Sequence, residues 1–142
     1  MFAKQLSVFI ENRKGRLSEV LNVLKANEVN IVSMSLADTT EYGLLRLLVN
    51  DPVLGKEKLS ENGFSTMLTN VLVLKISHEA GSLQNVLSML TDEGVNIEYM
   101  YGLSFNKDDA AVVLKASDLQ MADEALKKFG IKTLSTEEVN ML

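Results

Sequence analysis

The sequence contains no cysteine and no tryptophan, and only one proline and one histidine. Without cysteine the chain forms no disulfide, no thiolate metal site and no cysteine nucleophile. No uncharged apolar run approaches the roughly 18–20 residues that a membrane-spanning helix requires. Lys4 interrupts the N-terminus, and no long apolar segment typical of a secretory signal follows it. We therefore expect a soluble, cytoplasmic protein that has no membrane partner.

Basic residues are outnumbered and scattered. The chain carries 14 lysines and arginines against 19 acidic residues, which gives a net charge of −5. A nucleic-acid-binding surface needs clustered lysine and arginine to neutralise phosphates. We therefore expect no nucleic-acid partner, although the overall composition is that of a folded globular protein.

Catalytic motifs are missing as well. The chain has His78 as its one histidine and contains no HExxH, GxSxG, P-loop or GxGxxG spacing. Its acidic pairs, at positions 108–109 and 137–138, fall in a predicted turn and in the C-terminal tail, where solvated charge is the usual explanation. We therefore predict that the protein is not an enzyme and uses no metal and no cofactor.

An internal repeat organises the chain. Seven landmarks of a loop-and-helix segment each recur 66 residues later. They are Gly15, Leu17, Val20, Leu21, Leu24, Asn30 and Ile31 in the first copy, and Gly81, Leu83, Val86, Leu87, Leu90, Asn96 and Ile97 in the second. This common register indicates two small domains, which we place at residues 1–70 and 71–142.

Apolar patterning predicts the same order of elements in both halves. Alternation over residues 4–10 indicates a strand, and the i, i+3, i+4, i+7 spacing that begins at Leu17 indicates a helix as far as about Asn27. Further strands are predicted over residues 31–37, 42–49 and 65–68, and Pro52 is expected to start a second helix over 53–61. The first half therefore reads β-α-β-β-α-β.

The second half repeats this order. Strands are predicted over residues 71–76, 97–105, 110–116 and 132–134, and helices over 82–93 and 119–129, with Gly94 closing the first helix. Gly63 and Gly130 lie 67 residues apart, so one residue is expected to have been gained in the intervening turn. A short C-terminal turn is expected with Ser135 or Thr136 as its cap. Two such units predict an α+β protein built from ferredoxin-like antiparallel sheets with helices on one face.

The strongest candidate site is the loop before the first helix of each half. The first turn of a helix presents unpaired N–H groups and a partial positive charge, which suit a carboxylate. Gly15 and Gly81 allow a close approach there, and Asn12 offers the donors and acceptor that an α-amino acid requires. The first loop adds three cations, Arg13, Lys14 and Arg16.

The segment Asn12-Arg13-Lys14-Gly15-Arg16-Leu17, followed by Val29-Asn30-Ile31, resembles the ACT domain, an amino-acid-sensing regulatory module. It is especially similar to the serine-binding ACT domain of phosphoglycerate dehydrogenase, and the resemblance covers both halves. The resemblance implies two ACT domains side by side with the ligand between them. The loop asparagine of one domain would then act with the asparagine before the second strand of its neighbour, which would pair the Asn12 loop with Asn96 and the His78 loop with Asn30.

The second copy departs from this pattern. His78 replaces the loop asparagine, Glu79 and Ala80 replace the basic pair, and Ser82 replaces Arg16. An acid at this position weakens carboxylate binding, so the second site is expected to be altered, degenerate or selective for another ligand. The candidate ligand-binding residues are Asn12, Arg13, Lys14, Gly15, Arg16, Leu17 and Asn30, with His78, Glu79, Ala80, Gly81, Ser82, Leu83 and Asn96. A simpler alternative is that the loops only close turns and that the asparagines only begin strands.

A row of aromatic residues distinguishes the second half. Tyr99, Tyr101 and Phe105 are expected on one strand face together with Ile97 and Leu103, whereas positions 33 and 35 are serines. We interpret this face as a sheet interface or the wall of a ligand site. The alternative is ordinary core.

The resemblance predicts a regulatory protein without a catalytic step that binds a small amino acid and acts on a partner metabolic enzyme, or that forms a homodimer. The principal alternative is a regulatory or structural subunit that binds no ligand and uses its sheets to oligomerise or to hold an enzyme.

Overall fold

The computed structural model describes residues 1–38, 41–103 and 109–142. The chain divides into two compact units, which we describe separately. The N-terminal unit is Lys4–Thr69, and the C-terminal unit combines Met1–Ala3 with Asn70–Leu142. Across the described ranges, every helix is too short or too polar to cross a membrane.

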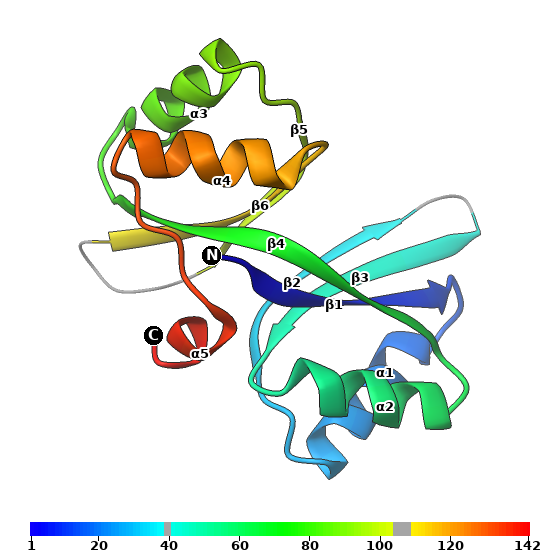
Figure 1. Ribbon diagram of the computed structural model, residues 1–142. Coiled ribbons are helices and arrows are strands. Elements are labelled where there is room, and N and C mark those ends of the chain that lie inside the picture. Colours follow the sequence, from blue (N-terminus) through cyan, green and yellow to red (C-terminus); the bar gives the residue numbers. More distant parts are fainter. Residues whose placement is uncertain (39–40, 104–108) are drawn as a thin grey trace. The chain divides into compact units, whose positions relative to one another are not determined.

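The N-terminal unit follows the predicted order of elements. These are β1 (Ala3–Glu11), α1 (Arg16–Ala26), β2 (Ile31–Asp38), β3 (Tyr42–Val49), α2 (Pro52–Glu61) and the beginning of β4 (Ser65–Ser77). The strands lie in the order β2-β3-β1-β4, and β1 and β2 both pair antiparallel with β3. Helices α1 and α2 cover one face of this sheet (Figure 1).

The core of the N-terminal unit lies between this sheet and its two helices. Leu6 pairs with Leu47, and Val8 pairs with Leu45, so alternate residues of both strands face the helices. All four side chains are fully buried, as is Val20 of α1. The period-two and helical spacings of the sequence are confirmed as the two sides of one core.

Helix α2 packs closely against this core. Its N-cap, Asp51, accepts a hydrogen bond from the backbone N–H of Leu54 at 3.0 Å, and Pro52 stands in the first turn as predicted. A Cβ atom added to Gly55 would lie 3.0 Å from Cδ2 of Leu6. The absence of a side chain at Gly55 therefore sets how near the helix lies to β1.

The C-terminal unit repeats the arrangement. Its elements are the remainder of β4, α3 (Ser82–Asp92), β5 (Ile97–Leu103), β6 (Asp109–Ala116), α4 (Leu119–Lys128) and α5 (Thr136–Asn140). The strand order is β4-β6-β5, again antiparallel, with α3 and α4 over one face (Figure 1). The buried core includes Leu72, Leu74, Val86, Leu90, Val95, Leu114, Ala116, Ala122, Ala125 and Leu126. Two units of this order confirm the predicted tandem α+β, ferredoxin-like fold.

Several helix ends and one insertion follow the sequence prediction. Gly94 adopts φ 81° after α3, and Ser135 caps α5 in a capping box with Glu138. Helices α1 and α3 are offset by 66 residues, whereas α2 and α4 are offset by 67. The same change separates the starts of β2 and β5 from those of β3 and β6, which confirms that the extra residue lies between these strands.

Two strand predictions were wrong. The strands predicted over residues 65–68 and 71–76 form one continuous strand of 13 residues, β4, because no glycine or proline interrupts them. The strand predicted over 132–134 is a single bridge between Thr133 and Leu74, flanked by hydrogen bonds from Lys75 N to Lys132 O at 3.3 Å and from Leu134 N to Val73 O at 2.9 Å. Asp109, predicted in a turn, begins β6.

The predicted aromatic face also needs a correction. The register shifts between Ile97 and Tyr99, so that Ile97 pairs with Ala116 while Tyr99 pairs with Lys115. This β-bulge turns Ile97 toward the helix-covered core, whereas Tyr99 and Tyr101 lie on the opposite face. Phe105 lies outside the described residues. The interpretation of the tyrosine face as an interface stays a prediction.

A buried carboxylate holds the first residues of the chain in the C-terminal unit. Asp123 of α4 is 3% exposed, and its Oδ1 atom lies 2.8 Å from the amino group of Met1. Its Oδ2 atom lies 3.0 Å from Lys127 Nζ. Burial raises the pKa of Asp123, but the hydrogen bonds and charges of Met1 and Lys127 outweigh burial and lower the pKa below its ordinary value of 3.8.

We predict that Asp123→Asn lowers the free energy of unfolding at pH 7 by about 1–2 kcal/mol, because a charge-assisted hydrogen bond is lost to partners that are largely exposed. A carboxylate whose folded-state pKa is lowered stabilises the fold above its unfolded value and loses this effect as pH falls through the folded pKa. Urea unfolding should therefore show a gap between wild type and variant that closes below pH 3.8. The exposed neighbour Glu124 supplies the control, Glu124→Gln, and an equal loss in that variant would contradict the assignment.

We predict that Gly55→Val destabilises the N-terminal unit by about 1–3 kcal/mol, because the new side chain must displace Leu6 from a filled core. The counterpart of Gly55 at the 67-residue offset is Ala122, which is fully buried in α4. Ala122→Gly is the matched change in the other unit and should lower stability through a cavity and a weaker helix. Thermal unfolding followed by circular dichroism measures both, and an unchanged melting temperature for Gly55→Val would refute close packing there.

Candidate functional site

The two candidate loops have the same backbone. Gly15 and Gly81 are the N-cap residues of α1 and α3, and each adopts φ 89° and ψ −11°. A Cβ atom at either glycine would meet nothing within 4 Å, so the left-handed backbone and not crowding is what favours glycine here. The repeat seen in the sequence is therefore also a repeat in loop conformation.

Both helices begin without a side-chain cap. The Arg16 amide donates to Arg13 O at 3.4 Å, and the Ser82 amide donates to Glu79 O at 3.2 Å. The next amides, those of Leu17 and Leu83, have no intrahelical partner because they belong to the first turn. Each helix therefore presents amide hydrogens and the positive end of its dipole at an exposed loop.

The three cations of the first loop have different surroundings. Arg13 forms an exposed ion pair with Glu11, in which Nε lies 2.9 Å from Oε2. Arg16 points back to the core: its guanidinium stacks over the Phe64 ring at 4.3 Å from the centroid and pairs with Glu19. Lys14 is exposed at the loop. The structure thus turns Arg16 away from the loop opening, whereas the other two cations remain near it.

The second loop has no such cationic group. His78, Glu79, Ala80 and Gly81 are exposed, and Ser82 and Leu83 are half-buried like Arg16 and Leu17. The Ser82 hydroxyl lies 2.7 Å from the Ser77 hydroxyl, which ties the start of α3 to the end of β4.

The two asparagines before β2 and β5 occupy matching positions. The Asn30 backbone N–H donates to the Asn50 side chain at 2.8 Å, and Asn96 Nδ2 donates to the Ser117 hydroxyl at 2.9 Å. Each asparagine follows the end of its helix, whereas the candidate loop precedes the beginning. An 11-residue helix is about 16 Å long, so neither unit brings its own loop and asparagine together.

Pockets lie at both ends of α1. The one at the loop has a volume of ≈ 100 Å³ and is lined by Asn12, Arg13, Leu17 and Leu36, among others. The one at the far end has ≈ 370 Å³ and includes Asn30. Ligand pockets usually measure about 300–1,000 Å³, so the loop pocket alone is too small to enclose a ligand.

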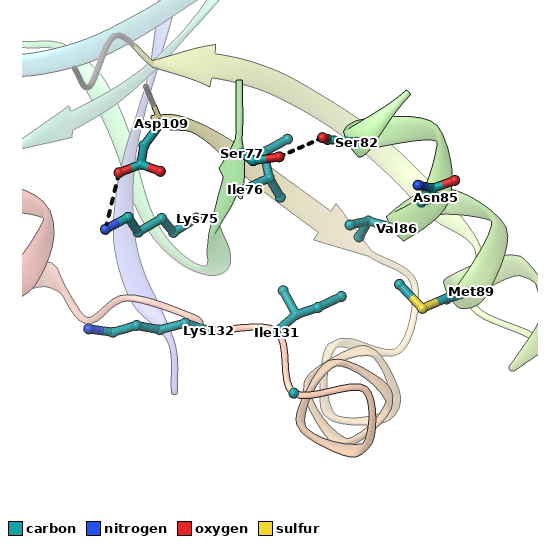
Figure 2. Close-up of a pocket in the computed structure, with 11 residues that line it drawn as sticks. Lys75, Ile76, Ser77, Ser82, Asn85, Val86, Met89, Asp109, Ile131 and Lys132 are labelled. Atoms are coloured by element: carbon teal, nitrogen blue, oxygen red, sulfur yellow. Dashed lines mark hydrogen bonds and ion pairs between the residues drawn. The ribbon is translucent and has the colours of Figure 1, made fainter. Parts of the chain in front are cut away.

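A larger pocket, of ≈ 460 Å³, lies in the C-terminal unit. Figure 2 shows Val86 and Met89 of α3 and Ile131, which follows α4, around one open space, with Lys75 and Lys132 extending along one side. Its lining also includes Ile76, Ser77, Ser82, Asn85, Asp109 and Gly130. Among the candidate ligand-binding residues, Ser82 is the one that this pocket includes.

Sequence analysis missed this pocket because no motif marks it. The signal was present in the comparison of the two copies, since Ser82 and Ile131 stand where the first half has Arg16 and Phe64. In the part of the chain that the structure describes, no three metal-ligating side chains gather into a metal site.

Comparison with known proteins agrees with the fold and the loops. The family of ACT domain pairs matches residues 1–140. A protein from Bacteroides thetaiotaomicron with a known crystal structure is 37% identical, with a TM-score of 0.95 over 100% of this chain and 98% of that chain. No curated protein sequence matches significantly.

More distant structures share the fold. The regulatory subunit of aspartate kinase from Thermus thermophilus, in its ligand-free form, is 14% identical, with a TM-score of 0.59 over 88% of this chain and 91% of that chain. Aspartokinase III from E. coli, in complex with lysine and aspartate, is 14% identical, with a TM-score of 0.51 over 90% of this chain and 31% of that chain. The family match over almost the whole sequence, on two units that both have the β-α-β-β-α fold and the left-handed glycine loop, shows that this chain belongs to the ACT domain pair family.

Proposed function

We propose that this chain is a non-catalytic regulatory protein that binds a small amino acid at its ACT loops and acts on a partner metabolic enzyme. The observation that carries the proposal is the uncapped start of α1 beside Asn12. The helix amides and dipole suit the ligand carboxylate, and the Asn12 amide suits its ammonium group. Membership of a regulatory family supports the same reading.

The geometry of one unit favours a ligand site that is completed by a second ACT unit. The loop pocket beside Asn12 is small, and Asn30 lies at the other end of α1. A ligand that touches a loop asparagine and an asparagine before the second strand therefore needs residues of two units. The pairing of the Asn12 loop with Asn96, and of the His78 loop with Asn30, stays a prediction.

The two loops are proposed to differ in ligand preference. Both supply the same backbone amides, but Arg13 and Lys14 surround the first and Glu79 stands in the second. The carboxylate of Glu79 repels a ligand carboxylate, so the first loop is the stronger amino-acid site.

A specific observation supports the alternative function, a subunit that oligomerises without binding a ligand. Strand β2 is an edge strand of the N-terminal unit, and its Met34 and Leu36 side chains are 40% and 51% exposed. Exposed apolar side chains on a sheet edge favour pairing with another chain.

We predict that one or more amino acids stabilise the wild-type protein in a thermal-shift panel that includes serine, lysine and aspartate. A ligand at about 100 times its dissociation constant adds roughly 2.7 kcal/mol to the folded state. Asn12→Ala should weaken that ligand about tenfold or more, because it removes hydrogen bonds to charged groups. Isothermal titration calorimetry measures this change.

The matched control is Asn22→Ala, which removes an exposed asparagine from the middle of α1 and should leave the affinity unchanged. Wild-type protein that shows no shift with any amino acid would contradict the ligand-binding proposal and leave the oligomeric alternative. Equal losses in both variants would show that Asn12 acts through helix stability.

The alternative makes its own prediction. If the β2 edge holds a second chain, Leu36→Lys should halve the molecular mass measured by light scattering after size exclusion, because a charge at the centre of the contact must be desolvated. The exposed Val53 of α2 provides the control, Val53→Lys. An unchanged mass for Leu36→Lys would remove β2 from any assembly.

A further inference from the structure

The two units differ most sharply where the first helix meets the segment that follows the second helix. In the N-terminal unit this position is filled, because the Arg16 guanidinium stacks over the Phe64 ring and pairs with Glu19. The Arg16 side chain is 15% exposed. In the C-terminal unit the corresponding residues are Ser82, Ile131 and Asn85, and all three line the ≈ 460 Å³ pocket.

The pocket has an apolar wall. Val86 and Met89 come from α3, Ile76 from β4 and Ile131 from the segment after α4. Val86 is buried, and the other three side chains are half-buried. These side chains border one open space in Figure 2. Such a wall suits a branched aliphatic chain, and the volume lies within the usual range for small-molecule sites.

The other side of the pocket is charged. Lys75 and Lys132 lie directly opposite each other, since Lys75 N donates to Lys132 O at 3.3 Å beside the Leu74–Thr133 bridge. Lys75 Nζ lies 3.4 Å from Asp109 Oδ2, and Lys132 Nζ lies 3.9 Å from Glu138 Oε1. Like charges placed opposite each other on neighbouring strands are unfavourable unless anions offset them.

A lysine ammonium carries three donors, so each can bind a ligand carboxylate beside its acidic partner. Charge-assisted hydrogen bonds of this kind are shorter and stronger than neutral ones. The two lysines stand at one side of the pocket and the apolar wall borders the rest (Figure 2). This arrangement matches a molecule with a carboxylate at one end and an aliphatic chain at the other.

We propose that this pocket is a second ligand site, separate from the loop site at Asn12, for a small carboxylate with a branched aliphatic chain. Lys75 and Lys132 hold the carboxylate, and Val86, Met89 and Ile131 cover the chain. The N-terminal unit has no equivalent site at this position because Arg16 and Phe64 occupy the space. The ACT pair is therefore asymmetric in what its units recognise.

The test uses three carboxylates with the same chain, which are 4-methylpentanoate, 4-methyl-2-oxopentanoate and L-leucine, and one uncharged analogue, 3-methylbutan-1-ol. Methyl-labelled protein is titrated with each and followed by NMR at Val86, Met89 and Ile131, with calorimetry for affinity. At least one carboxylate should shift these methyl signals, and the alcohol should bind at least tenfold more weakly. The best of the three shows whether the natural ligand is a simple acid, an oxo acid or an amino acid.

Variants then place the ligand. Ile131→Phe together with Ser82→Arg copies the filled arrangement of the N-terminal unit and should weaken binding at least tenfold. Ile131→Phe alone keeps the second loop intact and should also weaken it. Lys75→Met with Lys132→Met should remove the advantage of the carboxylates over the alcohol. Lys128→Met, which removes an exposed lysine of α4 outside the pocket, is the control.

Asn12→Ala separates this site from the proposed loop site, since pocket binding should survive it. Shifts at the three pocket residues that persist in Asn12→Ala and disappear in the filling variants support the second site even if the loop binds nothing. The second site is overturned by the absence of methyl shifts with all three carboxylates at 10 mM, a concentration of about the weakest useful affinity. Equal binding of the alcohol, or binding that the filling variants leave unchanged, overturns it as well.

Discussion

A left-handed glycine at the start of the first helix is the constraint on which each unit depends. Gly15 and Gly81 turn the chain from a strand into a helix with φ 89°, a conformation that costs other residues about 1–2 kcal/mol. The same turn leaves the helix without a side-chain cap. One backbone requirement therefore both connects strand to helix and presents amide hydrogens at the surface, which is why the loop is the centre of the proposed amino-acid site.

The duplication preserved the core and changed what surrounds it. Leu6, Val8 and Leu24 are buried in one unit, and their counterparts Leu72, Leu74 and Leu90 are buried in the other. Side chains outside these positions have diverged. Arg16 and Phe64 close in one unit a space that Ser82 and Ile131 leave open in the other. Because stability depends on the buried set, the surrounding positions were able to change without loss of the fold.

This asymmetry bears on how a regulatory ACT pair works. A ligand shifts an equilibrium between two states only by its difference in affinity for them. Two units with the same backbone and different side chains supply two such differences in one chain. The proposed loop site and the proposed pocket would then report on different small molecules, whereas two identical units would respond to one.

Prediction from sequence worked where one element carries its own signal. Alternation in β1, the apolar stripe of α1, the proline of α2 and the capping box of α5 all lie within a few residues of sequence. It failed where a neighbouring strand decides. The bulge at Ile97 arises from pairing with β6, and residues 132–134 make only one bridge with β4 because they run beside it for too short a length. The loop residues were found through the repeat, whereas Lys75 and Lys132 meet only through that bridge.

The sequence by itself determined that this chain is a duplicated β-α-β-β-α unit with a glycine loop before each first helix, because hydrophobic period and glycine placement act over short range. Only the tertiary structure decided that Arg16 stacks on Phe64 and turns away from the loop, that Ile97 faces the core, and that a pocket opens beside Ser82. These outcomes depend on which side chains meet across elements distant in the chain, and packing in three dimensions sets that meeting.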